Sequence, residues 1–536
     1  MRRSLLRAAL CGALAALCGV PPLAAAVTEP LTAEPRNPWL ADSTYPITHV
    51  ASGQPGSVAV AGPVDGSRVL GDADIAYRFM GPAHLIQVIS GPYPDGRRAI
   101  WSIGADRLVK QDYASFDIVD TLMLRADSPY TEAWAAERER AIESATGPLA
   151  VIQGLREMYL LRESQGLYPL IDRDNEFYVI RDGGVEVYGD LEPGNAGSRI
   201  ERKRRFEMPP GARGRLVGLN FTHDGWLVGV SETGDVVAVS RDFSRHYLAR
   251  LDGAPAEAVD PGGQLSGWVR NSLAVAPDNS VYIVSRDFMH CIRWTGQGWS
   301  QAEADGAWRE SYPNGAGNGS GATPTLMGFG DGDRFVVITD GDARMNLTLF
   351  WRDAIPPDWK GLPGLPRRIA ASRPATMGDP TLKAVQSEQS VGVLGYGALI
   401  VNNEPAHIPW YLPRRLGPVL VALLATRDDY RPLGVQKFEW NPATRTLDEA
   451  WVNREVSSPN AVPIISAGSN MVYTEGAREG HWTVEALDWQ TGASRFHWTL
   501  PRARHNTMFA PVVLDPDGRL MWGATWGRLR LQPRGG

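Results

Sequence analysis

Residues 486–498, Ala-Leu-Asp-Trp-Gln-Thr-Gly-Ala-Ser-Arg-Phe-His-Trp, decide the fold of this 536-residue chain. A strand ends in Ala-Leu-Asp, a tight turn follows at Thr491-Gly492, and Trp498 comes six residues after that glycine. Glycine permits a turn that a side chain would hinder, and tryptophan buries a large apolar surface. The segment is therefore typical of a hairpin whose tryptophan packs one sheet against its neighbour.

One unit recurs around this segment: a short apolar strand, a turn of Asp, Gly or Asn, and a second apolar strand. Regular copies occupy residues 216–230, 272–284, 325–339 and 511–522, and less regular copies turn near residues 105–106, 174–175, 395–397 and 468–470. Most intervals are about fifty residues, enough for the four strands of one β-propeller blade. The eight turns predict an all-β fold, an eight-bladed propeller over residues 27–536. Seven blades and two stacked sandwiches are the alternatives.

Residues 486–498 resemble the docking motif of the quinoprotein alcohol dehydrogenase-like β-propellers, in which a Trp of one blade packs against the next. A degenerate copy, residues 438–451, lacks the glycine. The resemblance implies the propeller fold and one candidate cofactor, the quinone PQQ. Alcohol dehydrogenases of that family often hold a vicinal disulfide against the quinone, which one mature cysteine cannot supply. Because the superfamily also contains scaffold propellers without a cofactor, the resemblance predicts the fold and does not predict the function.

The first 26 residues predict export. Arg2, Arg3 and Arg7 precede an apolar stretch, and Ala24-Ala25-Ala26 offers the small residues of a cleavage site. We therefore expect a signal peptide, residues 1–26, and a periplasmic or secreted protein. A lipoprotein would use Cys18, but the residue before it is a leucine where a small one is needed. The other apolar run, residues 418–425, is too short to span a bilayer and predicts a buried strand.

Charge and cysteine content exclude several classes of protein. Loss of three signal-peptide arginines leaves 51 basic against 60 acidic residues, a net charge of −9, so nucleic acid is not an expected partner. Cys291 is the only cysteine outside the signal peptide, so no internal disulfide forms. The chain has no Cys-x-x-Cys-His and therefore no c-type haem site. Serine-hydrolase, zinc-protease and phosphate-binding loop motifs are also missing.

Residues 131–162 interrupt the strand pattern with a segment rich in Glu, Ala, Arg and Leu. Apolar residues recur there with helical spacing, and Gly147-Pro148 divides the segment into two predicted helices. We expect a helical insertion between the first two blades. Its high charge predicts a peripheral position, with a lid over the channel mouth as the alternative.

Ligands of propellers bind at one end of the central channel, where loops from all blades converge. Residues at the start of the innermost strands should line that rim, and one carboxylate and several amides are predicted there: Glu388, Asn271, Asn460 and Asn506. Oxygen ligands of this kind suit Ca²⁺. They look similar to the rim residues of calcium-dependent propeller lactonases and arylesterases. The alternative is that these side chains only cap strands and turns.

Four further side chains are candidates for acid–base chemistry. Asp340 and Asp342 directly follow an apolar strand, and His407 and His505 lie near the predicted rim. Together, these residues predict an enzyme that acts on a small organic molecule. The reaction is either a quinone-dependent alcohol oxidation or a Ca²⁺-assisted hydrolysis of the lactonase type. The alternative is a binding or assembly scaffold without catalysis.

Overall fold

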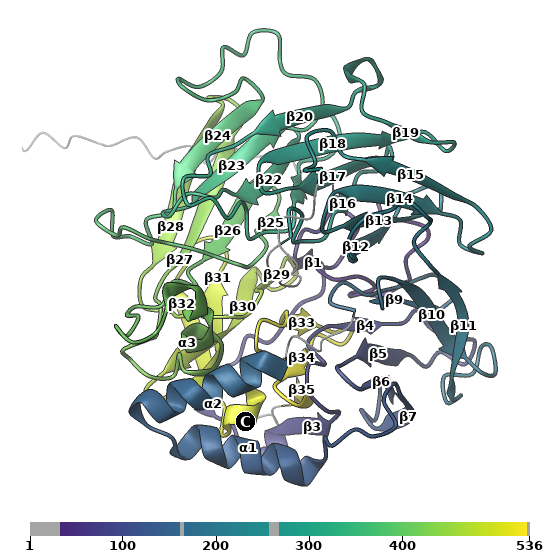
Figure 1. Cartoon of the computed structure of the whole chain (residues 1–536). Coiled ribbons are helices and arrows are strands. Elements are labelled where there is room, and N and C mark those ends of the chain that lie inside the picture. The colour runs from purple at the N-terminus through teal and green to yellow at the C-terminus, as the bar shows by residue number, and fades with distance from the viewer. Residues whose placement is uncertain (1–32, 161–165, 257–266, 533–536) are drawn as a thin grey trace, which may run out of the picture.

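The computed structural model describes residues 33–160, 166–256 and 267–532, which form a closed ring of β-sheets (Figure 1). Eight sheets are present in these described ranges. The predicted all-β, eight-bladed propeller is therefore confirmed. The two alternatives, a seven-bladed propeller and two stacked sandwiches, are wrong. The predicted signal peptide, residues 1–26, lies outside the described residues.

Within each blade the consecutive strands are antiparallel and run from the channel outward in sequence order, and three N-terminal strands, β1 to β3, join two of the blades out of this order. Along the chain the blades are β4 (Gln87–Ile89), β5 (Ala99–Ile103), β6 (Arg107–Asp112) and β7 (Ile118–Met123); β8 (Leu170–Ile171), β9 (Phe177–Arg181), β10 (Gly184–Asp190) and β11 (Ile200–Phe206); β12 (Leu216–Phe221), β13 (Leu227–Ser231), β14 (Asp235–Val239) and β15 (His246–Arg250); β16 (Ala274–Val275), β17 (Ser280–Val284), β18 (Phe288–Trp294), β19 (Trp299–Ser300) and β20 (Trp308–Ser311). The remaining blades are β21 (Thr325–Met327), β22 (Phe335–Thr339), β23 (Asn346–Trp351) and β24 (Ile369–Pro374); β25 (Gly392–Leu394), β26 (Gly397–Val401), β27 (Val435–Asn441) and β28 (Thr446–Asn453); β29 (Ile464–Ser466), β30 (Met471–Arg478), β31 (His481–Asp488) and β32 (Ser494–Thr499); and β33 (Val513–Leu514), β34 (Leu520–Ala524) and β35 (Gly527–Leu531).

Seven of the eight predicted turns join the two innermost strands of a blade, as expected. The turn at residues 105–106 instead joins β5 to β6, the second and third strands of its blade. The innermost hairpin of that blade turns at residues 90–98, a longer connection in which Asp95-Gly96 makes the turn. The count was correct because each blade still contributed one recognisable turn.

The N-terminal part of the chain closes the ring. β3 (Ile75–Phe79) pairs antiparallel with β35 and completes the last blade. β1 (Ser57–Val58) and β2 (Arg68–Val69) pair in parallel with β29 and β32, on the two edges of one blade. Pairing these edges removes the open strands on which other chains could add.

Three α-helices accompany the strands of the described residues: α1 (Glu132–Ser144), α2 (Gly147–Leu160) and α3 (Pro418–Leu423). Short 3₁₀ turns include η1 (Asp72–Asp74), η4 (Glu303–Asp305), η5 (Arg414–Leu416) and η6 (Ala503–His505). The predicted strand at residues 418–425 is wrong, because its place is taken by buried α3. A short apolar run has no periodicity that separates the two, and Pro418 suits the first turn of a helix.

The helical insertion packs against the last blade rather than standing apart. Glu157 on α2 pairs with Arg138 on α1 and accepts a hydrogen bond from Trp526 Nε1 at 3.2 Å. Glu139 pairs with Arg504 beside the last blade. Three charged side chains of the insertion, Arg138, Glu139 and Glu157, are buried in these ion pairs. Five others are exposed: Glu132, Glu137, Arg140, Glu143 and Arg156. One side of the insertion therefore packs on the propeller and the other is solvated, and the peripheral position stays a prediction. In Figure 1 the two helices lie in front of β33–β35.

The docking motif works as the resemblance implied. Gly492 has φ +70°, and a Cβ there would lie 2.4 Å from the ring of Trp451. Trp451 belongs to the neighbouring blade and donates from Nε1 to the carbonyl of Trp489 at 3.0 Å. The tryptophan of the degenerate motif therefore docks on the Thr-Gly turn of the regular one.

We expect Gly492→Ala to destabilise the protein more than Gly480→Ala. Both sites have positive φ, but a Cβ at Gly480 meets nothing within 4 Å. The control should lose about 1 kcal/mol for backbone strain alone, and Gly492→Ala about 2–4 kcal/mol because Trp451 must also move. Equilibrium urea unfolding measures both. Equal losses would show that the contact between Trp451 and Gly492 adds no stability.

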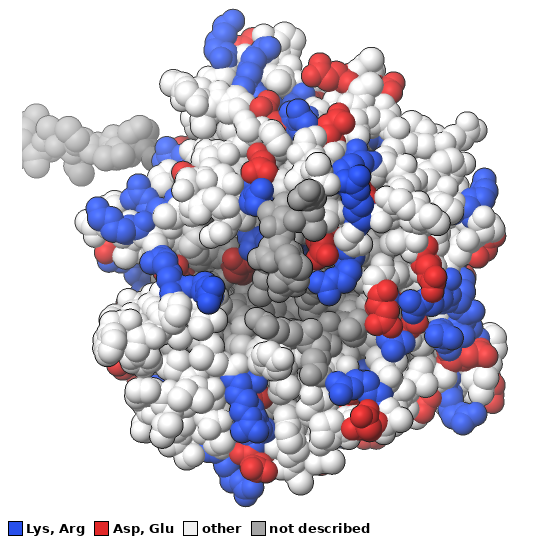
Figure 2. Space-filling view, in the orientation of Figure 1, with Lys and Arg blue, Asp and Glu red and all other residues white. Residues whose placement is uncertain are grey.

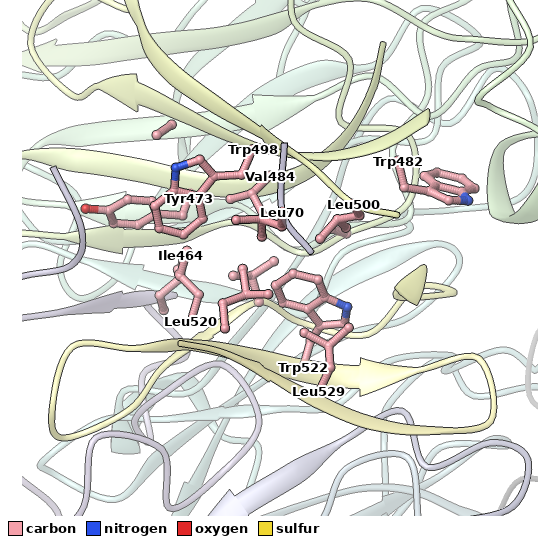
Figure 3. Close-up of a cluster of buried hydrophobic side chains, with 14 of the residues drawn as sticks. Leu70, Ile464, Tyr473, Trp482, Val484, Trp498, Leu500, Leu520, Trp522 and Leu529 are labelled. Atoms are coloured by element: carbon pink, nitrogen blue, oxygen red, sulfur yellow. The ribbon is translucent and has the colours of Figure 1, made fainter. Parts of the chain in front are cut away.

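Trp498 lies between two blades. It is fully buried in a cluster with Val484 and Tyr473 of its own sheet and with Trp522 and Leu529 of the next. Figure 3 shows the two groups of side chains facing each other across the space between the sheets. Its Nε1 donates to the carbonyl of Gly66 at 3.1 Å. The hydrogen-bonding partner of this tryptophan is therefore the segment before β2, and not a Thr-Gly turn.

Residues 44–58, which we call the channel segment, run around the inside of the ring. Most of their side chains are buried. In ring order the segment makes one hydrogen bond to each of the eight blades, through the pairs Thr44–Leu514, Tyr45–Ile89, Pro46–Ile171, Ser52–Asn220, Ser52–Val275, Gly53–Leu326, Pro55–Val393 and Gly56–Ile465. All of these blade residues belong to innermost strands. The channel is therefore lined by the N-terminal part of the chain itself.

All innermost strands begin at one face of the ring, which we call the mouth face. Because the strands of a blade alternate in direction, the connections between blades and those from the second to the third strand lie on this face. They include the segments that carry α1, α2 and α3. The opposite face consists mainly of tight hairpins. Longer loops on one face are typical of the side that carries function.

Candidate functional site

Polar side chains gather on the mouth face just before the innermost strands of four blades. We call this group, with one residue of the channel segment, the mouth cluster; its members are His49, Tyr168, Arg270, Asn271, Thr323, Glu388 and Ser390. Tyr168 precedes β8, Arg270 and Asn271 precede β16, Thr323 precedes β21, and the last two precede β25. Two of the predicted rim residues, Asn271 and Glu388, belong to it.

A chain of contacts joins all four of these blades. The Tyr168 hydroxyl donates to Asn271 Oδ1 at 3.4 Å. Arg270 Nη2 donates to the carbonyl of Ser320 at 3.0 Å, and the Asn271 amide reaches the same oxygen at 3.4 Å. Arg270 Nη1 lies 3.8 Å from Glu388 Oε2. Backbone acceptors thus orient the guanidinium toward the carboxylate of the neighbouring loop.

The channel segment contacts this cluster at the point where its backbone reverses direction. His49 and Val50 adopt φ +64° and +87°, so the chain reverses there. His49 Nε2 lies 3.2 Å from Ser390 Oγ, which also accepts from the backbone N–H of Thr323 at 3.1 Å. The imidazole lies 6.5 Å from the Tyr168 ring, and its Nδ1 has no hydrogen-bond partner among the described residues.

The side chains of the mouth cluster differ in charge. Burial lowers the pKa of His49 to about 4, so its ring is neutral at neutral pH. Burial also raises the pKa of Tyr168, and the negative charge of Glu388 adds to this effect. The Glu388 side chain is 46% exposed, whereas that of Arg270 is 14% exposed. A neutral hydroxyl, a guanidinium and an accessible carboxylate therefore meet at the mouth.

Asn460 and Asn506 lie elsewhere and have a structural role. Both are fully buried, with the Asn460 amide 3.2 Å from Asn506 Oδ1. Asn460 donates to the carbonyls of Val421 and Ala422, and Asn506 donates to the latter as well, so the pair holds α3 in place. The Asn460 oxygen accepts from a threonine hydroxyl and that of Asn506 from the backbone of Met508.

These contacts do not fit a calcium site made of the four predicted ligands. The oxygens of Asn460 and Asn506 are occupied by donors. Burial raises the pKa of the adjacent Glu475 to about 8, so this carboxyl is mostly uncharged at pH 7. Glu388 faces a guanidinium instead of an open cation site. We derive no step through calcium, and calcium binding stays a prediction of the sequence alone.

Asp340 and Asp342 belong to the turn between β22 and β23. Asp340 accepts from Asn346 N at 2.8 Å, Asn346 Nδ2 at 2.6 Å and Asp342 N at 3.2 Å. Burial raises the pKa of Asp340 to about 6 despite these bonds. Asp342 Oδ1 accepts from Gly315 N at 2.7 Å. Asp340 thus shapes its own turn, and Asp342 holds the connection between β20 and β21.

The two predicted histidines lie apart from the mouth cluster. His407 is exposed in the connection between β26 and β27. His505 is buried beside Tyr77, with ring centroids 6.1 Å apart, and burial lowers its pKa to about 4. A neutral buried ring at the edge of the last blade packs against aromatic neighbours. Neither side chain contacts another predicted site residue through a described hydrogen bond.

Five members of the mouth cluster were not among the predicted ligands: His49, Tyr168, Arg270, Thr323 and Ser390. Four of them also stand at the start of an innermost strand, but only amides and carboxylates were taken as ligands. His49 carries no such signal, because its position depends on the path of the channel segment.

A groove with a volume of about 560 Å³ lies outside the mouth, between α1 and residues 501–504. Its charges pair with one another, as in Arg502–Asp72 and Arg504–Glu139. We interpret it as the seam where the insertion packs on the last blade. We place the candidate site at the mouth, where a guanidinium, a tyrosine hydroxyl and a carboxylate converge. None of the described helices is long and apolar enough to cross a membrane.

Comparison with known proteins places the fold. No protein-family model matches the chain. The quinohemoprotein alcohol dehydrogenase of Comamonas testosteroni superposes with a TM-score of 0.50 at 12% identity, over 94% of this chain and 82% of that chain. That of Pseudomonas putida HK5 gives a TM-score of 0.49 at 14% identity, over 90% and 76%. The similarity to quinohemoprotein dehydrogenase propellers holds for the fold only.

A curated relative shows the family. An uncharacterized protein of Archaeoglobus fulgidus is 32% identical over 515 residues, which cover 94% of this chain and 90% of the relative. Such a match over nearly the whole length includes the blades and the segments that close the ring. The chain therefore belongs to the same family as this Archaeoglobus protein, a family with the fold of the quinohemoprotein alcohol dehydrogenase propellers.

Proposed function

We propose that the protein is an exported enzyme that acts on a small organic molecule bearing an anionic group, held at the mouth of the propeller. The observation that carries this proposal is the meeting of Arg270, Glu388 and Tyr168 at the starts of innermost strands. Sites that combine a cation, a hydroxyl and an accessible carboxylate bind and orient polar ligands.

Each group has a role in this proposal. Arg270, fixed by the carbonyl of Ser320, places the positive charge of its guanidinium where a carboxylate or phosphate of the ligand binds. The Tyr168 hydroxyl stays protonated and donates to Asn271, so its oxygen accepts a hydrogen bond from a hydroxyl group of the ligand. Glu388 takes the proton that either reaction class predicted from the sequence requires, from an alcohol or from an attacking water. Binding and proton transfer then depend on separate residues.

Thermal unfolding with a panel of hydroxy acids, lactones and sugar acids tests the binding part, with matched neutral alcohols as controls. A ligand at about a hundredfold above its Kd stabilises the folded state by about 2.7 kcal/mol. We expect an anionic compound to do this in the wild type but not in Arg270→Met. Equal stabilisation of both proteins would place the ligand elsewhere.

Turnover of that compound tests the catalytic part. Glu388→Gln keeps the shape of the side chain, so binding should persist while the rate falls by about 10²–10⁴. The matched control is Glu207→Gln, whose carboxylate is 80% exposed and ion-paired with Arg205 on an outer strand. Unchanged turnover in Glu388→Gln would remove Glu388 from the reaction.

A further inference from the structure

One part of the mouth face exposes large apolar side chains. Leu149, Ile152 and Tyr159 of α2 are 63%, 56% and 60% exposed, and Trp410 and Tyr411 in the connection to α3 are 95% and 40% exposed. We call these five residues the docking face. A tryptophan almost fully exposed to water is costly, and apolar side chains gathered on one surface mark an interaction site.

The orientation of α2 makes this exposure unusual. The side of α2 that faces the protein carries the small residues Ala150, Val151 and Gly154. A Cβ at Gly154 would lie 2.8 Å from Val419 of α3, so the two helices pack closely. The larger apolar residues at positions 149, 152 and 159 follow one another at helical spacing on the outer side. A helix that only packed on the propeller would place them inward.

The two halves of the docking face rest on one buried cluster. Ala150 and Val151 beneath α2 share this cluster with Val419 of α3 and with Leu412, which follows the exposed aromatic pair. The rings of Trp410 and Tyr411 lie edge to face, with centroids 5.9 Å apart. In Figure 2 the surface over α2 and α3 is mostly white, with few charged side chains.

Within α2 and residues 405–418 the exposed charges have one sign, and the acidic residues Glu404, Asp428 and Asp429 lie outside these two segments. The exposed charged residues of α2 and of residues 405–418 are Arg156, Arg414 and Arg415, and the one acidic residue in these segments, Glu157, is buried. Arg414 also pairs with Glu404 at its edge. The chain without its predicted signal peptide carries a net charge of −9, so this basic and apolar surface is local. An anionic surface is its electrostatic complement.

We propose that the docking face binds the surface of an anionic phospholipid bilayer. Trp and Tyr prefer the level of the lipid headgroups, Leu and Ile enter the acyl boundary, and arginines pair with phosphates. α2 then lies flat on the bilayer, and the protein binds as a peripheral protein. Because α2 and the connection to α3 both belong to the mouth face, binding turns the mouth toward the lipid.

Co-sedimentation with vesicles tests this proposal. The purified protein without its first 26 residues should bind vesicles of equal parts phosphatidylcholine and phosphatidylglycerol, and bind pure phosphatidylcholine at least tenfold more weakly. Raised salt should weaken binding because the headgroup attraction is screened. Trp410→Ser combined with Tyr411→Ser should lower the affinity at least tenfold, since two aromatic contacts with the acyl boundary are lost.

Matched variants separate this result from loss of folding. Val64→Ser replaces an apolar residue that is 71% exposed outside the docking face, and it should bind as the wild type does. Melting temperatures should agree across the set, because every changed side chain is exposed. Equal binding by the aromatic double variant and the wild type would overturn the proposal, as would a wild type that binds neither kind of vesicle. A concentration-dependent dimer that disappears in Trp410→Ser would also overturn it and assign the face to a second copy of the chain.

Discussion

A chain that begins at Ala59 should lose the cooperative unfolding transition of the ring, whereas a chain that begins at Ala33 should keep it. The first truncation removes the channel segment, which bonds to the innermost strand of every blade. At about 1 kcal/mol for each buried hydrogen bond, the loss is on the order of 10 kcal/mol even before lost packing is counted. That is comparable with the whole stability of a typical domain.

Differential scanning calorimetry of the two truncations measures this effect. The chain that begins at Ala33 is the control, because it lacks the same signal peptide and keeps all described residues. A sharp transition at nearly the same temperature in both proteins would show that the eight blades hold together without their lining.

The second large effect is expected at Trp498. Trp498→Ala removes a fully buried ring from the cluster between two blades and a hydrogen bond to Gly66, and should cost about 3–5 kcal/mol. Trp410→Ala deletes the same side chain where it is 95% exposed, and should change the free energy of unfolding by less than about 0.5 kcal/mol. Urea unfolding compares them, and a loss below about 1 kcal/mol at Trp498 would contradict the docking interpretation.

The repeats could be predicted from the sequence because each hairpin is formed by residues that are close together along the chain. Strand, turn and strand lie within about fifteen residues, and the alternation of apolar side chains with Gly, Asp and Asn reports them directly. The docking motif added the contact between neighbouring blades. Trp451 and Gly492 belong to the degenerate and the regular copy of the motif, and the structure shows that these two residues meet.

The path of the channel segment could not be predicted from the sequence, because its contacts are distant along the chain. Its residues adopt their path because of partners in all eight blades, the most distant of them 470 residues along the chain. Nothing in the pattern around His49 or Ser52 reports such contacts. The same limit applies to α3, whose apolar run was assigned to a strand until its neighbours were known.

The candidate site was predictable in position and only partly in composition. Asn271 and Glu388 stand where innermost strands begin, as expected. Asn460 and Asn506 stand at the same kind of position, but their amides hold the backbone of α3. The two pairs cannot be told apart by their position at the start of a strand. Their roles differ because Asn271 and Glu388 lie beside the guanidinium of Arg270, whereas Asn460 and Asn506 contact α3.

The pairing of β3 with β35 sets the order in which the ring can be completed. The strand at residues 75–79 is synthesised early, yet its partner at residues 527–531 is among the last to be made. Until then the last blade lacks most of its strands, and the early segment has nothing to pair with. Such distant contacts favour slow folding, and we expect closure of the ring to be a late step. Once the ring is closed, neither β3 nor β35 can detach without breaking a blade, so the barrier that delays folding also delays unfolding.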